Sequence, residues 1–185
     1  MSEYLDVVDE HGNPTGEIVE RGIAHRDGIP HRTSHVWLLR EHDGHVQVLL
    51  QKRAQDKDSY PGCYDISSAG HIPAGVDYIP SALRELQEEL GITARAEELI
   101  HCGDRVILWD DVFQGREFHD RQYSRVFVLW RDLEESDFAI QAEELESVRW
   151  MDFEACITGV EQNLFPNCIV MEELMMVAGA SGQKQ

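Results

Sequence analysis

Three glutamates at helical spacing stand near the middle of this 185-residue chain. If the segment is a helix, Glu85, Glu88 and Glu89 stand at positions i, i+3 and i+4, so their carboxylates share one face about a turn apart. An apolar series marks the opposite side: Leu83, Leu86 and Leu90. The spacing therefore predicts a helix that buries its leucines and leaves its acidic face open to solvent or ligand.

Three carboxylates on one patch are typical of a divalent-cation site. Their hard oxygen atoms suit Mg²⁺, with Mn²⁺ as a second choice. Without a cation the carboxylates repel one another, so the pKa of at least one should rise. Arg84 stands four residues before Glu88 and can offset part of this repulsion. An acidic cluster in isolation is more often a plain solvated helix face, so the flanking residues have to decide.

The flanking residues extend the pattern over residues 70–92, which resemble the Nudix box, G-x5-E-x7-R-E-U-x-E-E-x-G-U with U an aliphatic residue. The matching positions are Gly70, Arg84, Glu85, Leu86, Glu88, Glu89, Gly91 and Ile92. One position departs, because Val76 stands where the family has its first glutamate, with Asp77 one residue out of register. In the family that glutamate commonly supports the box arginine, so the change indicates weaker support for Arg84.

The resemblance implies a metal-dependent Nudix hydrolase. Metal-activated water would cleave a diphosphate linkage in a nucleoside di- or triphosphate or in a nucleoside diphosphate derivative. The implied metal ligands are Glu85, Glu88, Glu89 and the backbone carbonyl of Gly70, and the implied catalytic residues are Glu88, Glu89 and Arg84. Val76 leaves one alternative open, a catalytically weakened Nudix module that binds a nucleotide.

A further glutamate is a candidate general base. Several Nudix enzymes carry a catalytic glutamate on a loop before the segment that ends the sheet. Glu143, Glu144 and Glu146 stand at the corresponding place here, of which we select Glu144, and Glu117 and Asp120 are further candidates. A charged loop without a catalytic role explains Glu144 equally well.

Longer stretches outside the box are similar to a Nudix branch related to isopentenyl-diphosphate isomerase. They include HRDGIPHRTSHVWLL, LLQKRAQDKDSYPG and YDISSAGHIPAG. The isomerase holds a metal with histidines that match His25, His31 and His71, so the resemblance implies a second metal site, where imidazole suits Mn²⁺ or Zn²⁺. The chain has nine histidines, and a solvated or backbone-bonded role for these three is the alternative.

Isomerase activity is the alternative function within this branch. The reaction needs a proton donor and a proton acceptor across an alkene, and the isomerase takes them from a Cys before its Gly-His pair and from a downstream Glu. Ala69 and Gln122 take those two positions here, and neither side chain can transfer a proton. The residues therefore favour hydrolysis over isomerisation.

Several cationic and aromatic residues are candidate substrate contacts. Lys52, Arg53 and Lys57 could bind phosphate, although basic residues at a strand end are most often surface. Candidates for stacking a base, with core packing as the alternative, are Trp37, Tyr60, Tyr64 and Trp109.

The net charge and the apolar content of the chain limit the kinds of partner that it can bind. A formal net charge of -19 repels long polyanions, so we expect no long nucleic acid as a partner. A small diphosphate substrate stays compatible, because a bound cation reverses the field locally. No apolar run approaches the ~20 residues that cross a bilayer, and the acidic start MSEYLDVVDEHG carries no readable signal. We expect no membrane partner and a cytoplasmic location, while the oligomeric state stays open, a homodimer included.

Local patterns indicate an α/β or α+β fold. Two hairpins are expected, 4–8 with 17–21 and 35–40 with 45–52, joined by a loop rich in His, Gly and Pro. Further strands are expected over 65–69, 105–109, 122–130 and 148–151, and helices over 81–90, 152–157 and 166–177. Asp77 can cap the first helix and Gly91 can close it. The resemblance implies a Nudix-type α/β/α sandwich with a mixed central sheet. We expect one Nudix domain over residues 1–178 and a flexible tail over 179–185.

Overall fold

The computed structural model describes residues 2–57, 59–113 and 115–182. Its strands are β1 (Tyr4–Val8), β2 (Pro14–Glu20), β3 (His31–His42), β4 (His45–Arg53), β5 (Tyr64–Asp65), β6 (Ser68–His71), β7 (Ile100–Phe113), β8 (Arg116–Trp130) and β9 (Leu145–Asp152). Its helices are α1 (Arg21–Asp27), α2 (Tyr78–Leu90), α3 (Phe153–Glu161) and α4 (Met171–Ala180), with short 3-10 turns η1 (Ala96–Glu98) and η2 (Glu135–Asp137).

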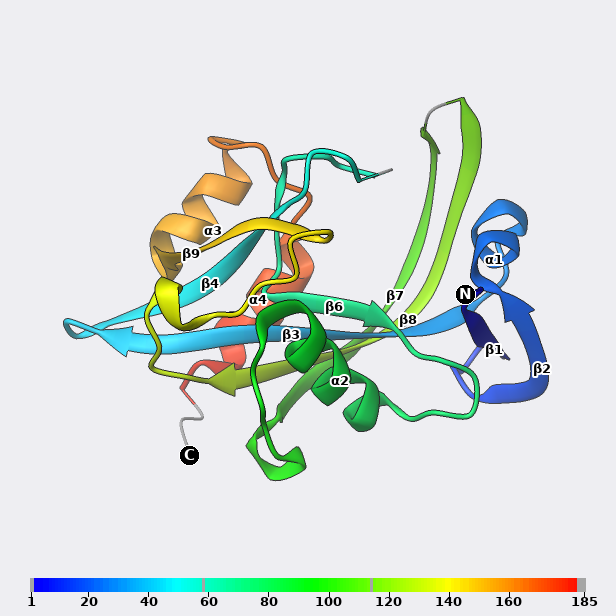
Figure 1. Ribbon diagram of the computed structural model, residues 1–185, viewed down its shortest axis with the longest axis horizontal. Coiled ribbons are helices and arrows are strands. Elements are labelled where there is room, and N and C mark those ends of the chain that lie inside the picture. Colours follow the sequence, from blue (N-terminus) through cyan, green and yellow to red (C-terminus); the bar gives the residue numbers. More distant parts are fainter. Residues whose placement is uncertain (1, 58, 114, 183–185) are drawn as a thin grey trace.

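A mixed sheet organises the chain (Figure 1). Its strands run in the order β5-β4-β3-β8-β7, while β6 also pairs with β3 and β9 with β4. β3 and β8 are parallel, and the other pairs are antiparallel. β1 and β2 form a separate two-stranded sheet. The predicted α/β fold with a mixed central sheet is confirmed.

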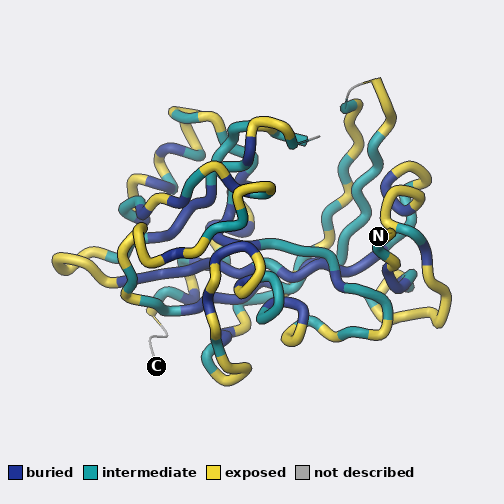
Figure 2. The backbone as a smooth tube through the Cα atoms, viewed as in Figure 1, coloured by how far each residue is buried: buried dark blue, intermediate teal, exposed yellow. Residues whose placement is uncertain are grey.

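Helices cover both faces of the central sheet, and each face has its own apolar core. Alternation along β3 sends Val36 and Leu38 into the core shared with α2, and Trp37 and Leu39 into the core shared with α3 and α4. All four side chains are fully buried. Figure 2 shows the buried backbone running through the central strands. This is the α/β/α arrangement that the sequence resemblance implied.

The helix that carries the three glutamates is confirmed. Asp77 caps α2 by accepting a hydrogen bond from the Tyr78 amide, and Pro80 lies in the first turn, where its missing N–H costs no helical hydrogen bond. Gly91 ends the helix at φ 70°, a left-handed conformation that glycine adopts without strain. Leu86 and Leu90 are fully buried.

The second predicted hairpin is also confirmed, with a longer first strand. Asp43 and Gly44 form the tight turn between β3 and β4 with φ of 51° and 79°, as a two-residue hairpin loop requires. β3 begins at His31 rather than at residue 35, because its first residues pair with β6 and β8 instead of β4.

Two regions differ from the sequence prediction. The stretch expected as a loop contains α1, whose first turn is capped by the Glu20 side chain at the Ile23 amide. β7 and β8 extend well beyond the predicted segments and form a two-stranded arm that rises away from the sheet in Figure 1. A seven-residue helix is too short to show a period, and both sides of the arm mix polar with apolar residues.

The end of the chain also departs from expectation. α4 continues through Ala180, so the tail boundary expected at residue 178 falls inside a helix. Residues 183–185 of that tail lie outside the described residues. Among the helices that the structure describes, none is long and apolar enough to cross a membrane.

Candidate active site

A broad cleft of about 1970 Å³ collects most of the predicted site residues. Its floor includes Thr33 and His35 of β3 and Gln122 of β8, which alternation places on one face of the sheet. Its walls are α1, the acidic side of α2, the β7–β8 arm, and Arg53, Asp56, Lys57, Ser59 and Tyr60. Residues far apart in the chain therefore face one another across this cleft.

Two of the three glutamates pack against β6. The Ala69 amide donates a hydrogen bond to Glu89 Oε2 at 3.3 Å, and Glu89 is only 8% exposed. Gly70 leaves the space that the Glu85 side chain fills. The Glu88 side chain is 52% exposed. The expectation of an open acidic face is wrong for Glu85 and Glu89, because this side of α2 lies against a strand edge.

Burial changes the protonation of these two carboxylates. It raises the pKa of Glu89 to about 8 and the pKa of Glu85 to about 7, and the charge of a neighbouring glutamate adds to the rise in both. The predicted rise is confirmed, with burial rather than repulsion as its main cause. A cation would stabilise the ionised forms, so this set of hard oxygen donors fits Mg²⁺ or Mn²⁺.

Arg84 ties the glutamates to the loop that precedes α2. Its Nη1 donates to Glu88 Oε2 at 3.0 Å, and its Nη2 donates to Glu85 Oε1 at 2.5 Å and to the His71 carbonyl at 3.3 Å. Asp77, which stands next to the position of the missing glutamate, has its contacts elsewhere and not with Arg84. Its carboxylate accepts from the Tyr78 amide at 2.7 Å and lies 3.9 Å from Arg32.

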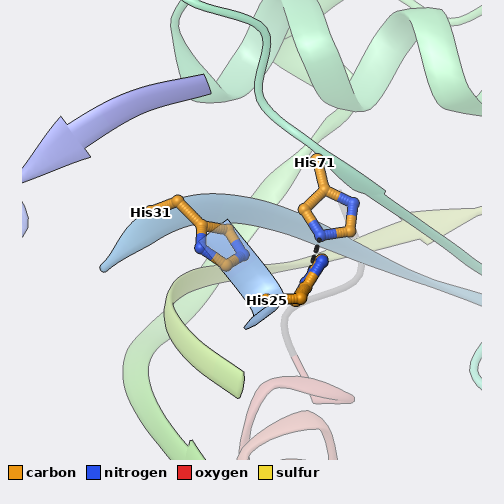
Figure 3. A group of neighbouring side chains, drawn as sticks. All are labelled: His25, His31 and His71. Atoms are coloured by element: carbon orange, nitrogen blue, oxygen red, sulfur yellow. Dashed lines mark hydrogen bonds between the residues drawn. The ribbon is translucent and has the colours of Figure 1, made fainter. Parts of the chain in front are cut away.

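The three predicted histidines come together at the edge of the cleft (Figure 3). His25 comes from α1, His31 from the start of β3 and His71 from the end of β6, and one ring nitrogen of each lies within 4.8 Å of the others. His25 Nε2 and His71 Nε2 are 3.3 Å apart. His25 and His31 are buried, so the solvated alternative is wrong for them.

One buried atom of this cluster has no hydrogen-bond partner. His31 Nδ1 bonds to the Ile29 carbonyl at 2.9 Å, which leaves His31 Nε2 buried without a hydrogen-bond partner. A buried polar atom without a partner is costly, and a metal ion held by the three imidazoles would satisfy it. Asp120 lies beside the cluster, with its Oδ1 also buried without a hydrogen-bond partner and 3.8 Å from His25 Nε2.

Burial also sets the charge of the cluster. It lowers the pKa of His25 to about 3, with the nearby His31 as the next cause, and it lowers the pKa of His31 and His71 as well. The same effect raises the pKa of Asp120 to about 6. The imidazoles are therefore neutral at physiological pH, which is the form that binds metals.

Glu144 lies on the wall of the same cleft. Its carboxylate forms an ion pair with Lys57, and its carbonyl accepts from the Ala54 amide at 3.0 Å. Its charge is close enough to contribute to the raised pKa of Glu89. The structure therefore brings Glu144 to the side of the acidic helix.

A group of aromatic rings forms the far wall. Tyr60 stacks on Trp109 with ring centroids 5.6 Å apart, and Phe113 packs against both. Phe118 joins Phe113 to the histidine cluster, since it also stacks on His25 at 4.5 Å. All four rings are partly exposed and line the cleft, and we call them the aromatic wall. Sequence reasoning missed Phe113 and Phe118, although alternation from Trp109 along the arm could have found Phe113.

Other candidates have structural roles. Trp37 is fully buried, with its indole N–H donated to Glu173, and Tyr64 packs edge-on against Phe165, so neither is free to stack a base. Arg53 holds Ser59 and Asp65, and Lys52 pairs with Glu146 at 2.6 Å. Both side chains are therefore used in contacts within the protein rather than in binding a substrate phosphate.

The buried group under the cleft floor was also missed. Glu173 of α4 accepts hydrogen bonds from Trp37 and Arg105 and bonds to His35 Nδ1 at 2.9 Å. Glu173 is 138 residues from His35 in the chain, so no local pattern could have paired them.

Comparison with known proteins identifies the domain. The model of the NUDIX domain matches residues 29–167. Nudix hydrolase 3 of Arabidopsis thaliana is 38% identical over 154 residues, which is 82% of this chain but 19% of the plant protein. This chain thus spans about a fifth of that relative. An isopentenyl-diphosphate Delta-isomerase of Aliivibrio fischeri is 28% identical over 151 residues, covering 81% of this chain and 80% of the isomerase.

Solved structures share the fold. The protein DR0079 of Deinococcus radiodurans superposes with a TM-score of 0.67 at 16% identity, over 95% of this chain and 98% of that chain. The NUDIX domain of Shewanella oneidensis NrtR, complexed with ADP ribose, gives a TM-score of 0.57 at 15% identity, over 82% and 86%. At these identities the likeness concerns the fold alone. Because the NUDIX domain model matches residues 29–167, which is most of this chain, the chain belongs to the Nudix hydrolase family.

Proposed function

We propose that this protein is a Mg²⁺-dependent hydrolase that cleaves a diphosphate linkage in a small molecule, with Mn²⁺ as an alternative metal. The observation that carries the proposal is the packing of Glu85 and Glu89 against β6 beside the more exposed Glu88, with Arg84 bonded to Glu85 and Glu88. The proposed metal ligands are Glu85, Glu88, Glu89 and the carbonyl of Gly70. A cation bound there would supply charge neutralisation for the diphosphate and lower the pKa of a bound water.

The remaining chemistry falls to residues on the cleft walls. We assign Glu144 as the general base that orients the attacking water, because its carboxylate lies close to Glu89 and is held by Lys57. Arg84 orients the carboxylates through its bonds to Glu85 and Glu88. The Lys57 ammonium lines the same cleft and is our candidate contact for a substrate phosphate oxygen.

The aromatic wall favours a nucleoside over a prenyl group. Its four rings are partly exposed, and charged residues of the same cleft surround them, among them Asp56, Arg116 and Glu117. A flat base with polar edges suits such a surface better than an aliphatic chain, which needs a closed apolar channel. The ADP ribose bound by the NrtR domain is consistent with this choice. The proposed substrate is therefore a nucleoside di- or triphosphate or a nucleoside diphosphate derivative.

We further propose that His25, His31 and His71 hold a second metal. The unpartnered His31 Nε2 and the close approach of the three ring nitrogens support this site, and Asp120 lies beside it, 3.8 Å from His25. Three neutral imidazoles suit Mn²⁺ or Zn²⁺ better than Mg²⁺.

A screen for diphosphate cleavage with Mg²⁺ or Mn²⁺, which reads the phosphomonoester and pyrophosphate products, tests the proposed reaction. The panel includes nucleotides, dinucleotides, nucleotide sugars and prenyl diphosphates. Glu88→Gln and Glu89→Gln should each lower kcat by about 10²-fold or more with the fold intact, the loss typical when a main electrostatic contact of the transition state is removed. Glu154→Gln on α3 changes an exposed glutamate and should match wild type.

Three outcomes would contradict the proposal. Turnover that survives both substitutions would remove the acidic helix from the catalytic centre. Conversion of isopentenyl diphosphate without phosphate release would show an isomerase, against the argument from Ala69 and Gln122. A metal-dependent shift in Tm with nucleotides but no diphosphate cleavage across the panel would show a binding module.

A further inference from the structure

The loop between β6 and α2, residues 72–77, is fastened to the N-terminal hairpin. Leu5 and Pro73 form an antiparallel bridge, and the Ala74 amide donates to the Tyr4 carbonyl at 2.8 Å. The Gly75 amide donates to Asp6 Oδ2 at 3.0 Å. β1 thus lies alongside the loop that leads into the acidic helix.

A buried ion pair anchors this contact from the other side. Asp6 and Arg32 are 9% and 7% exposed, and Arg32 Nη2 donates to Asp6 Oδ2 at 2.9 Å. The same nitrogen donates to the Val76 carbonyl at 2.8 Å, and the guanidinium lies over the Tyr78 ring, 5.3 Å from its centroid. One arginine therefore holds β1, the loop and the first residue of α2 together.

The start of the loop depends on the same residue. The Ile72 amide donates to the Arg32 carbonyl at 3.0 Å, directly after His71. The His71 carbonyl in turn accepts from Arg84, which bonds to Glu85 and Glu88. Contacts thus run without interruption from Asp6 through Arg32 and the loop to the proposed metal ligands.

We infer that Asp6 and Arg32 are positioning residues that set the loop 72–77, and with it the carboxylates and the Gly70 carbonyl, for metal binding. This inference rests on the proposed function. It also accounts for Val76 at the position where other members of the family carry a glutamate. The loop is held here through the backbone of Gly75 and Val76, so it does not need a glutamate side chain at that position. Asp6 lies outside residues 29–167 and Arg32 lies inside them, so the pair joins the N-terminal hairpin to the matched domain.

The contacts of the Asp6–Arg32 ion pair indicate that its main role is to fix the geometry of loop 72–77 rather than to add to the stability of the fold. A buried ion pair contributes little net stability by itself, while removing one partner leaves the other buried and uncompensated. Arg32 Nη2 bonds at once to the Asp6 carboxylate and the Val76 carbonyl, and Asp6 Oδ2 also accepts from Gly75, so the pair constrains loop geometry at several atoms. The predicted effect is therefore on metal affinity and kcat more than on substrate KM.

The test compares Asp6→Ala with Asp9→Ala. Asp9 stands in the same hairpin, and its carboxylate accepts from the His11 and Asn13 amides within the β1–β2 turn. Asp9→Ala therefore weakens the hairpin without touching loop 72–77. Asp6→Asn is the milder companion, since it keeps one oxygen that can accept from Gly75, and it serves if Asp6→Ala does not fold.

Each folded variant is measured for Mn²⁺ affinity by electron paramagnetic resonance in a His31→Ala background, which removes the proposed histidine site. Amide hydrogen exchange of residues 72–77, kcat and KM are measured as well. Asp6→Ala should weaken Mn²⁺ binding and lower kcat by about 10- to 100-fold, as loss of an outer support of a metal ligand typically does, with KM changed by less than about twofold. The loop amides should exchange faster. Asp6→Asn should fall between Asp6→Ala and wild type, and Asp9→Ala should match wild type in all three measurements.

Two results would overturn the inference: a folded Asp6→Ala protein with wild-type Mn²⁺ affinity and kcat, or losses of equal size in Asp9→Ala. Mn²⁺ affinity and hydrogen exchange need no turnover. If wild-type protein binds Mn²⁺ but hydrolyses nothing, the proposed function fails while the role of Asp6 is still decided by those two readouts.

Discussion

Glu85 occupies the space that a side chain at Gly70 would need: a Cβ on Gly70 would lie 2.1 Å from Glu85 Cδ and 2.2 Å from its Oε1. The glycine of the box is therefore a steric requirement for the carboxylate that packs beside it. The strand places Gly70 opposite Ser34 of β3, so its backbone cannot move away from α2 without breaking the sheet.

Gly70→Ala is expected to displace the Glu85 carboxylate. The clash should cost about 1–3 kcal/mol of unfolding free energy, the usual range for overpacking, and the displaced ligand should weaken Mg²⁺-dependent turnover by about tenfold or more. Denaturant unfolding and steady-state kinetics measure the two effects. Gly179→Ala in α4 is the control, because nothing lies within 4 Å of its Cβ position and it should be neutral or slightly stabilising. A Gly70→Ala protein with wild-type metal dependence would show that Glu85 is not a ligand.

Metal binding at the acidic helix should strengthen as pH rises towards about 8. The folded pKa of Glu89 lies above its ordinary value of 4.5, so the metal-free protein retains a proton that the unfolded chain releases. Its free energy of unfolding therefore falls as pH rises from about 4.5 to about 8, and a cation has to displace this proton below about pH 8. Apparent Mg²⁺ affinity should gain up to about tenfold per pH unit between pH 7 and 8, and more steeply between pH 6 and 7, where Glu85 with a pKa of about 7 also has to lose a proton.

Thermal shift with Mg²⁺ across this pH range measures the effect. Glu89→Gln has no proton to release at this position and should show weaker binding with a flatter pH profile. A wild-type profile that is flat from pH 6 to 8 would mean that Mg²⁺ binds elsewhere.

The histidine cluster should respond differently to pH. Burial lowers the pKa of His25 to about 3 and depresses the pKa of His31 and His71 as well, so the imidazoles are already neutral at pH 7. Zn²⁺ binding there should release few protons and change by less than about threefold in affinity between pH 7 and 8. His31→Ala should abolish this site, whereas His45→Ala, at a side chain that is 74% exposed, should leave it unchanged. Calorimetry in two buffers of different ionisation enthalpy gives the proton count, and a full proton released per Zn²⁺ would contradict the assignment.

The features that could be predicted from the sequence are those encoded within one short segment of the chain. The acidic helix was predictable because its period, its Asp77 cap and its Gly91 terminus all lie within one short segment. The burial of Glu85 and Glu89 was not, since it depends on how closely β6 approaches α2. The histidine cluster came from a resemblance, and only the fold shows that Asp120 stands beside it. Contacts across long sequence separations, such as Asp6 with Arg32, leave no local periodic signal.

The aromatic wall predicts how the substrate is held. Trp109 faces the cleft, while Val112, three residues further along β7, alternates to the other side and is 60% exposed. Trp109→Ala should raise KM for a nucleoside diphosphate substrate by about 5- to 150-fold with kcat little changed, since base stacking on an aromatic ring contributes about 1–3 kcal/mol. Trp109→Phe should recover most of the affinity, and Val112→Ala should match wild type. Inorganic pyrophosphate, which has no base, is the matched probe: its turnover should not respond to Trp109. Equal losses for the nucleotide and for pyrophosphate would show that Trp109 supports the catalytic groups and does not bind the base.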